Sequence, residues 1–284
     1  MRETMNIQWF PGHMTKARRM IAENVKLVDA VCEIIDARIP YSSRNPDLDE
    51  MTGGKPKLII LNRADQADPA ATSNWVESFK NGGAAVLETD SKSGKGISGL
   101  SGAVRFLLSE RIDYYKSKGQ TGRRIRVMVA GIPNVGKSSF INRAAGRKAA
   151  PASDKPGVTR GKQWITVDSS LELLDTPGVL WPRFEDQTVA ENLAFTGAIR
   201  DEVLDLESLW ANLMLRLAQY YPDRIESRYK TSAIEYDNGF DLLERAAKSR
   251  GFLISGGEYD LNRMAAVLLD EFRGGKLGRI TLEK

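Results

Sequence analysis

The stretch Gly131-Ile-Pro-Asn-Val-Gly-Lys-Ser138 decides the fold class of this chain, because it matches the phosphate-binding pattern G-x-x-x-x-G-K-[ST]. Residues 124–130 before it, which end in the apolar run Val127–Ala130, predict a strand, and residues 137–145 after it predict a helix. Glycines in such a turn let backbone N–H groups approach phosphates, and the helix N-terminus adds partial positive charge. We therefore expect Lys137 to reach the β- and γ-phosphates of a nucleotide and Ser138 to hold Mg²⁺.

A second phosphate-side motif, Asp175-Thr-Pro-Gly178, follows a strand predicted over residues 171–174. That strand forms a predicted hairpin with residues 164–167. Asp175 can hold Mg²⁺ through water, and Gly178 can offer its backbone N–H to the γ-phosphate. Both motifs therefore point to the same phosphate site.

Further phosphate-site residues lie in and between these motifs. Thr159, in Pro156-Gly-Val-Thr159, is placed to close on Mg²⁺ only when the γ-phosphate is present. The candidate catalytic residues of the phosphate site are Lys137, Thr159 and Gly178. The other loop residues expected to contact the nucleotide are Pro133, Asn134, Val135, Gly136 and Ser139.

Asn62-Arg63-Ala64-Asp65 follows a strand predicted over residues 57–61 and resembles the N-K-x-D guanine motif of GTPases. Asp65 can accept hydrogen bonds from N1–H and from the exocyclic amine of guanine. Adenine presents no such pair of donors, so a carboxylate distinguishes the two bases. Arg63 stands where the motif has Lys, and its aliphatic stem can still cover the base.

Asp90-Ser91-Lys92 follows the next strand, predicted over residues 85–89, and resembles the S-A-K guanine loop. A backbone N–H near Ser91 would meet the guanine O6 atom, whereas Asp90 departs from the common Ser. The two base motifs at neighbouring strand ends together predict GTP and GDP as the bound nucleotides.

The order of these motifs is unusual, because both guanine motifs precede the phosphate motifs. The motifs keep the usual cyclic order of GTPases, but the chain begins at a different point of that order. Residues 31–36 correspond to the strand that normally follows D-x-x-G. The old ends would be joined through residues 97–124, where apolar residues at helical spacing predict a helix over 97–117. We expect an α/β fold: a circularly permuted P-loop GTPase domain with a mostly parallel sheet and helices on both faces.

The pattern changes after about Pro182, where helical periodicity replaces the alternation of strands and helices. Helices are predicted over residues 187–197, 205–219, 238–250 and 260–273. We expect residues 1–182 to form the GTPase domain, with an N-terminal segment and helix over 1–28. Residues 183–284 are expected to form a small helical domain that binds RNA or the ribosome.

Composition and charge narrow the class of protein. The chain has 284 residues, 42% hydrophobic content and a net charge of +4, with no apolar run long enough for a transmembrane helix. The one cysteine, Cys32, lies in an apolar strand and is expected to be buried, which fits a cytoplasmic protein. Two basic stretches, 111–126 and 143–162, flank the phosphate motif and favour an RNA partner. In the helical region the candidate basic contacts are Arg263, Arg273, Lys276 and Arg279.

The chain closely resembles the circularly permuted RbgA/YlqF family of bacterial ribosome-assembly GTPases. The resemblance rests on the motif order and on four stretches: Trp9-Phe-Pro-Gly-His-Met14, Asp36-Ala-Arg-Ile-Pro40, Asn45-Pro46 and Asp175-Thr-Pro-Gly-Val-Leu-Trp-Pro182. It covers nearly the whole chain. It implies binding to a precursor of the large (50S) ribosomal subunit and a role in its late maturation, with ribosomal RNA and ribosomal proteins as partners. GTP hydrolysis, stimulated by the particle, would drive release; we expect a monomer with no membrane attachment.

The group that orients the attacking water is the open point. Many GTPases place a Gln just after D-x-x-G, but here Val179 and Leu180 occupy that region. His13 is the only histidine. A lone histidine is usually structural or a surface residue, but its place in the family's most specific segment makes it our candidate for a partner-dependent catalytic group. The resemblance also implies a K⁺ ion at Asn134, whereas the alternative is that Asn134 only shapes the loop.

Three other functions fit parts of the sequence. One is a GTPase switch acting on a protein partner, and another is a GTPase serving an RNA-modification enzyme. A third is an RNA-binding module with a structural nucleotide, which the intact Lys137, Ser138, Asp175 and Gly178 disfavour. Sedimentation with ribosomal subunits separates these alternatives.

Overall fold

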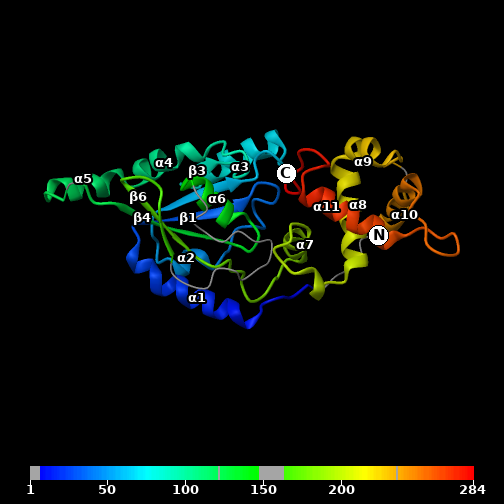
Figure 1. Cartoon of the computed structure of the whole chain (residues 1–284), viewed down its shortest axis with the longest axis horizontal. Helices are drawn as coiled ribbons and strands as arrows, with labels where there is room; N and C mark the ends of the chain where they lie inside the picture. Colours follow the sequence, from blue (N-terminus) through cyan, green and yellow to red (C-terminus); the bar gives the residue numbers. More distant parts are fainter. Residues whose placement is uncertain (1–6, 121, 147–162, 235) are drawn as a thin grey trace. The chain divides into compact units, whose positions relative to one another are not determined.

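The structure is a computed structural model that describes residues 7–120, 122–146, 163–234 and 236–284. The chain forms two compact units: Phe10–Arg183, and Phe184–Lys284 together with residues 7–9 (Figure 1). Each unit is taken by itself below. The expected switch residue Thr159, and all of the second basic stretch beyond residue 146, lie outside the described residues.

The first unit is built on a six-stranded sheet with the order β3-β2-β1-β4-β6-β5 (Figure 1). All neighbouring strands are parallel except β5 and β6, which form the expected antiparallel hairpin. The strands span β1 Ala30–Asp36, β2 Lys57–Asn62, β3 Ala85–Glu88, β4 Ile125–Gly131, β5 Gln163–Thr166 and β6 Leu171–Asp175.

The strand order confirms the circular permutation. In an unpermuted chain, β4 would be the first strand, because it leads into the phosphate loop; β5 and β6 would be the second and third, and β1, β2 and β3 the fourth, fifth and sixth. Read from β5 to β3 with these numbers, the strand order of the sheet is 2-3-1-4-5-6. Strand β4 is therefore central, and the chain continues from it to both sides of the sheet. In open α/β sheets, ligands bind outside the carboxyl ends of the strands at such a switch point.

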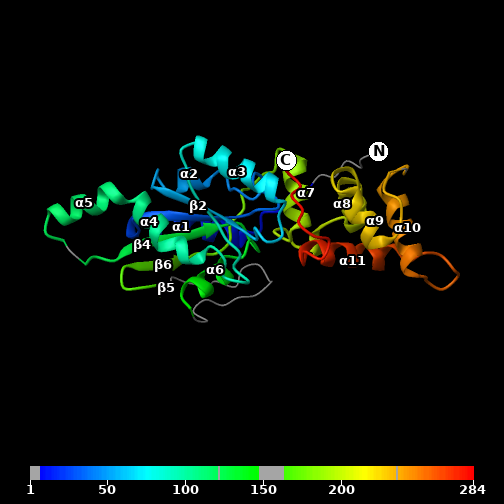
Figure 2. The ribbon, with the colours of Figure 1, turned by 90° about the horizontal axis from the view of Figure 1, so that it is seen from above.

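Helices cover both faces of the sheet (Figure 2). Helices α2 and α3 lie on one face, and α4 and α6 on the other. In the first unit the helices are α1 Gly12–Asn24, α2 Leu48–Met51, α3 Pro69–Asn81, α4 Leu100–Leu107, α5 Ser109–Ser117 and α6 Lys137–Ala144, with 3-10 turns at Val25–Leu27 and Ile97–Gly99.

Local sequence explains the central elements. Every residue of β1 is buried, as expected for a strand covered on both faces, and the Cys32 thiol is fully buried within it, as predicted. Helix α3 begins where the sequence indicated, because the Asp68 carboxylate accepts from the N–H groups of Ala70 and Ala71 and Pro69 occupies the first helical position. The ring of Phe79 then packs against the apolar face of β1 and β2.

The single helix predicted over residues 97–117 is wrong. A 3-10 turn, α4 and α5 follow one another there, and Leu108, between α4 and α5, leaves helical geometry at φ −108° and ψ 17°. The physical reason is that the buried stripe ends at Leu108: α4 buries Leu100 and Val104, whereas α5 buries none of its residues.

The second unit contains five α-helices and a 3-10 turn among its described residues. They are α7 Gln187–Phe195, η3 Asp201–Val203, α8 Leu206–Tyr220, α9 Pro222–Tyr229, α10 Gly239–Arg250 and α11 Leu261–Arg273. Four match the predicted helices within a few residues, and α9 was missed. Side chains cap α7, α10 and α11 at their N-termini, namely Asp186, Asn238 and Asp260.

One basic contact expected in this unit has a structural role instead. The Arg273 guanidinium bonds to the Asp201 carboxylate at 2.7 and 2.8 Å and to the carbonyls of Ala194 and Phe195 at the end of α7. The guanidinium of Arg263 lies over the Phe252 ring, with its central carbon 4.2 Å from the ring centroid. Within the described ranges, no helix is both long and apolar enough to span a membrane.

Candidate functional site

The predicted motifs converge at one edge of the sheet. Strands β4, β6, β1 and β2 run parallel, and β3 runs with them, so the loops that follow them leave from the same edge. The phosphate loop follows β4, Asp175–Gly178 follows β6, and the two guanine motifs follow β2 and β3. Segments far apart in the sequence therefore form one site.

Lys137 opens α6 and lies folded over its own loop. The side chain is 8% exposed, and its ammonium donates to the carbonyls of Gly131 at 3.2 Å and Ile132 at 2.8 Å. Burial lowers the pKa of Lys137 to about 8, although the Asp175 carboxylate opposes the shift. A buried ammonium beside a carboxylate at a helix N-terminus is suited to binding a phosphate oxygen.

Gly178 brings the Asp175 motif against the phosphate loop. A Cβ atom at this position would lie 2.8 Å from the backbone N and Cα of Pro133 and 3.0 Å from the Lys137 ammonium. Any larger residue would therefore push the two loops apart. The Asp175 side chain itself is buried, and the neighbouring Thr176 hydroxyl donates to the Val129 carbonyl at 2.7 Å, which fixes the start of the motif.

The residues expected around Mg²⁺ fit that ion chemically. The half-buried Ser138 lies in the first turn of α6, and the buried Asp175 ends β6 beside β4. A hydroxyl and a carboxylate are oxygen ligands of the kind Mg²⁺ takes together with phosphates and water. Ser139 is exposed on the same turn.

Asn62 connects the base side of the site to its phosphate side. Its amide nitrogen donates to the Val135 carbonyl at 3.0 Å. Its amide oxygen accepts from the Ser91 N–H at 3.2 Å, the Ser91 hydroxyl at 2.7 Å and the Thr89 hydroxyl at 3.3 Å. Gly136 has to be glycine here, since it has φ +95° and a Cβ would lie 2.4 Å from the Asn62 amide nitrogen. Sequence reasoning assigned Asn62 to the site but gave no indication of these contacts.

Arg63 also connects the base side of the site to the phosphate side. Its guanidinium donates to the Asn134 carbonyl at 3.2 Å and lies 3.7 Å from the Asp36 carboxylate. Arg63 and Asn134 both have left-handed backbone, with φ of 59° and 56°. The Asp36 carboxylate is also bound by the buried Arg38 at 2.7 and 2.9 Å. Burial works to raise the pKa of Asp36, but the two arginines outweigh it, so the carboxyl stays ionised.

Asp65, the residue predicted to select guanine, is exposed, and the N–H of its neighbour Ala64 donates to the Thr89 carbonyl at 3.1 Å. Partial burial raises the pKa of Asp65, and the Asp90 carboxylate raises it further. A carboxylate at this position can offer two acceptor oxygens to the two N–H donors on the guanine edge.

Asp90, the departure from the S-A-K pattern, shapes its own loop. Its carboxylate accepts from the N–H groups of Lys92 at 2.8 Å and Ser93 at 3.2 Å. Burial works to raise the pKa of Asp90, but the Ser93 and Lys92 hydrogen bonds outweigh it and hold the pKa below its usual range. The Arg143 guanidinium donates to the Lys92 carbonyl and so holds this loop to α6, a contact that sequence reasoning missed.

The segment after Gly178 is held by three other parts of the first unit. The Val179 N–H donates to the Gly131 carbonyl at 3.2 Å, and the Val179 carbonyl accepts from the Asn45 amide at 3.0 Å. The Leu180 N–H contacts the Met14 sulfur at 3.3 Å. His13 is exposed in the first turn of α1, next to Met14 in the chain. The histidine is therefore one residue from a direct contact with the switch segment.

This fold and site define a circularly permuted P-loop GTPase. A family model described as 50S ribosome-binding GTPase matches residues 126–223. Ribosome biogenesis GTPase A from Bacillus cereus is 45% identical over 98% of this chain and 94% of its own length, and the Thermotoga maritima protein of that name is 30% identical over 98% and 94%. The chain belongs to the ribosome biogenesis GTPase A (RbgA/YlqF) family and is a GTPase.

Solved structures agree with this assignment. GNP-bound YlqF from Thermotoga maritima matches with a TM-score of 0.67 and 29% identity, covering 95% of this chain and 98% of that one. A GDP-bound YlqF structure matches with the same TM-score and 28% identity, covering 94% and 99%. Binding of a guanine nucleotide is thus a property of the family.

Proposed function

We propose that this GTPase binds a precursor of the large ribosomal subunit, promotes its late maturation and is released when GTP is hydrolysed. The observation that carries the proposal is the convergence of the described phosphate and guanine motifs at one edge of the sheet, on a chain that matches ribosome biogenesis GTPase A along 98% of its length. The expected partners are ribosomal RNA and ribosomal proteins of that particle, with contacts from both the GTPase unit and the helical unit.

The site divides the nucleotide between two sets of residues. Asp65 would select guanine, with the Arg63 stem along the base and the Ser91 loop at O6. Backbone N–H groups of residues 134–139, with the Lys137 ammonium, would hold the phosphates, and Pro133 would line the same loop. Ser138 and Asp175 would hold Mg²⁺, which supplies positive charge to the phosphate oxygens when bound. Thr159 completes this proposed set.

His13 is the proposed water-orienting group. Val179 and Leu180 stand where many GTPases have Gln, and both are buried and apolar. The contact of Met14 with Leu180 brings the first turn of α1 to the segment after Gly178. A shift of the exposed His13 side chain on binding the particle would then place the imidazole at the γ-phosphate, which would account for stimulation by the partner.

Asn134 is the proposed K⁺ ligand. It lies half-buried in the phosphate loop, and its left-handed backbone and its carbonyl contact with Arg63 fix its position. A monovalent cation there would add positive charge beside the β- and γ-phosphates, where the transition state gains charge.

Nucleotide state would reach the partner through Val179. This residue is bonded to the phosphate loop on one side and to Asn45 on the other, and the chain enters the helical unit after Arg183. Movement of Gly178 on loss of the γ-phosphate would pull on this segment. Residues 9–10, where the chain passes between the units a second time, would respond to the same movement.

The test is GTP turnover with and without purified large-subunit precursor particles, with small subunits as the control. We expect the precursor alone to stimulate turnover of the unmodified chain, and His13→Ala to keep its basal rate and its GDP affinity while losing most of the stimulation. Absence of stimulation by the precursor contradicts the proposed function. Full stimulation of His13→Ala contradicts only the role of the histidine.

A further inference from the structure

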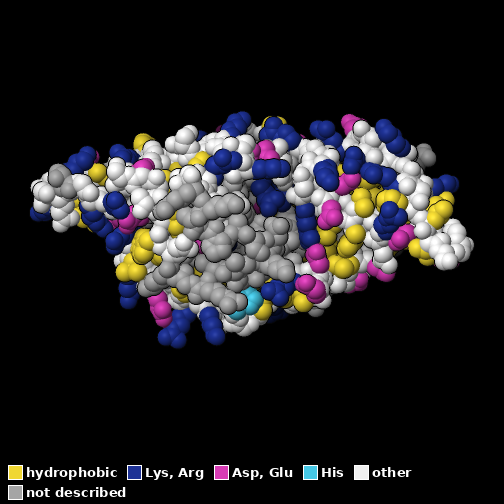
Figure 3. Space-filling view, in the orientation of Figure 1, with side chains coloured by type: hydrophobic (Ala, Val, Ile, Leu, Met, Phe, Trp, Pro, Cys, Tyr) yellow, Lys and Arg dark blue, Asp and Glu magenta, His cyan; other side chains and the backbone are white. Residues whose placement is uncertain are grey.

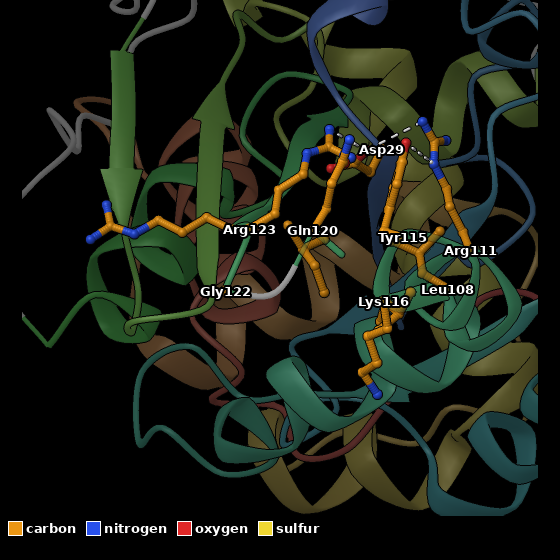
Figure 4. Close-up of a pocket in the computed structure, with 11 residues that line it drawn as sticks. Asp29, Leu108, Arg111, Tyr115, Lys116, Gln120, Gly122 and Arg123 are labelled. Atoms are coloured by element: carbon orange, nitrogen blue, oxygen red, sulfur yellow. Dashed lines mark hydrogen bonds and ion pairs between the residues drawn. The ribbon is translucent and has the colours of Figure 1, made fainter. Parts of the chain in front are cut away.

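A pocket of about 190 Å³ lies where strands β1 and β4 begin, at the edge of the sheet opposite the nucleotide site (Figure 4). Strand β4 runs from the pocket residue Ile125 to Gly131 of the phosphate loop. At about 3.3 Å per residue, this separates the two sites by roughly 20 Å. None of the residues placed at the nucleotide lines this pocket, so it needs its own explanation.

One wall of the pocket is aromatic. Leu108 and Ile112 line it together with the ring of Tyr115 from α5. The Arg123 guanidinium stacks on that ring, with its central carbon 4.5 Å from the ring centroid, and the Arg111 guanidinium donates to the Tyr115 hydroxyl at 3.0 Å. A flat ring beside planar cations over an apolar floor is the environment that holds an unpaired nucleobase.

The two arginines share one carboxylate. Asp29 lies 3.0 Å from the Arg123 guanidinium and 3.4 Å from that of Arg111 (Figure 4). The Asp29 carboxylate also accepts from the Arg126 N–H at 3.0 Å. Because one carboxylate faces two guanidiniums, both arginines are held in position, and the three side chains together keep a net charge of about +1. Arginines held in this way can bind a phosphate oxygen.

The same arrangement recurs beside the pocket. Glu172 lies 2.7 Å from the Arg124 guanidinium and 3.3 Å from that of Arg126. The Arg126 guanidinium also lies over the ring of Trp164, with its central carbon 5.0 Å from the ring centroid. Trp164 is 36% exposed, so part of a second aromatic ring faces solvent.

Exposed lysines and another aromatic ring extend the surface along α5. Tyr114 is 59% exposed, and the Lys118 ammonium lies 5.8 Å from its ring centroid. Lys116 is exposed on the same helix. In Figure 3, dark-blue Lys and Arg side chains gather around α5, at the left of the view. Basic side chains alternating with exposed aromatic rings are the pattern of a surface that tracks single-stranded nucleic acid.

We propose that the α5 surface, which comprises Tyr114, Tyr115, Lys116, Lys118, Arg123 and Arg124, binds a single-stranded segment of RNA. One unpaired base stacks on Tyr115 in the pocket, and neighbouring phosphates lie against the arginines and lysines. Double-stranded RNA keeps its bases stacked and offers none for the pocket. This surface is part of the connection that joins the ends of the permuted sheet, so the permutation supplies an RNA contact at the edge away from GTP. The proposal stands independently of the hydrolytic mechanism.

The first test measures binding of a short fluorescein-labelled single-stranded RNA, and of a fully paired RNA duplex, to the full-length chain by fluorescence anisotropy across a KCl series. Removing two phosphate contacts with Lys116→Gln/Lys118→Gln should weaken single-strand binding by about tenfold and flatten the salt slope by about 1.4. Tyr115→Leu, which removes the ring and keeps an apolar side chain, should weaken binding by about tenfold without changing that slope. The duplex should bind more weakly than the single strand.

The matched control is Lys16→Gln/Lys80→Gln, which removes two exposed lysine charges from α1 and α3. This control should bind RNA like the unmodified chain, and all variants should keep the basal GTP turnover. Equal RNA affinity of the α5 variants and the unmodified chain overturns the proposal. Binding of the duplex as tightly as the single strand, or of neither RNA, overturns it as well.

A second test leaves the chain unmodified and does not depend on the stability of any variant. Single-stranded RNA containing 4-thiouridine is cross-linked to the protein by light, and the modified peptides are mapped by mass spectrometry. Cross-links on the peptide that contains Tyr114 and Tyr115 support the proposal. Cross-links confined to residues 184–284 contradict it.

Discussion

Replacing Asn62 with alanine removes a carboxamide that bonds the first guanine segment to the second one and to the phosphate loop. In the folded protein this side chain is 1% exposed and takes part in four hydrogen bonds. After the substitution, the half-exposed Ser91 regains water. The Val135 carbonyl and the Thr89 hydroxyl stay buried and lose this partner.

The size of the effect follows from those two buried groups. A buried polar atom left without its partner costs about 1.5 kcal/mol, so Asn62→Ala should lower the free energy of unfolding by about 3 kcal/mol. Ser91→Ala removes only the 2.7 Å hydroxyl contact and should lower it by about 1 kcal/mol. Because both variants remove the same bond, the double variant should lose about 1 kcal/mol less than the sum of the two single losses.

The assay is urea unfolding of the nucleotide-free chain for the two single variants and the double variant, followed by titration with a fluorescent GDP. Asn62→Ala should weaken GDP binding by about tenfold, because the loops that hold the base and the phosphates lose their shared partner. Asn81→Ala, at an exposed asparagine that ends α3, is the control and should stay within about 0.5 kcal/mol of the unmodified chain. Asn62 does not connect the loops if Asn62→Ala lowers the free energy of unfolding no more than this control does. Strictly additive losses in the Asn62→Ala/Ser91→Ala double variant would refute the connection as well.

Three further predictions concern the base, the cation and acid stability. Asp65→Asn should weaken GTP binding by about tenfold or more, since it replaces a charged acceptor of two guanine donors; competition against fluorescent GDP measures this, and unchanged affinity contradicts the base assignment. GTP turnover should be several-fold higher in KCl than in equal NaCl, and Asn134→Ala should abolish the difference; equal rates in the two salts argue against the cation at Asn134. Burial works to raise the pKa of Asp168, but hydrogen bonds from Ser101 and Ser170 outweigh it and lower the pKa from 3.8 to about 2. The stabilisation from this depressed pKa is therefore complete above pH 3.8 and lost as the pH falls toward 2, so unfolding of Asp168→Asn should depend less steeply on pH in that window.

Local patterns were enough to predict most of the fold. The strand before Gly131, the hairpin that ends at Asp175 and the Asp68-Pro69 start of α3 each depend on neighbouring residues, and the structure has them where expected. The permutation could also be read from the sequence, because the order of motifs fixes which strand follows which. The break at Leu108 could not be predicted, since apolar spacing continues past it and only the packed structure shows where burial stops.

The contacts that assemble the site lie beyond local sequence. Asn62 meets Val135 across 73 positions, and Asn45 meets Val179 across 134. No spacing rule marks such pairs, because they depend on how parallel strands bring distant loops to one edge. Arg273 is a similar case: its basic side chain suggested an RNA contact, and nothing in the sequence indicated that it also bonds to the carbonyls at the end of α7.

The central claim is that the nucleotide state of this permuted site controls attachment to a precursor of the large ribosomal subunit. The most direct measurement is the affinity of the full-length chain for purified precursor particles, by sedimentation, with a non-hydrolysable GTP analogue and with GDP. The GTP-analogue form should sediment with the precursor at protein concentrations where the GDP form stays in the supernatant. Equal affinity in the two nucleotide states would contradict the claim.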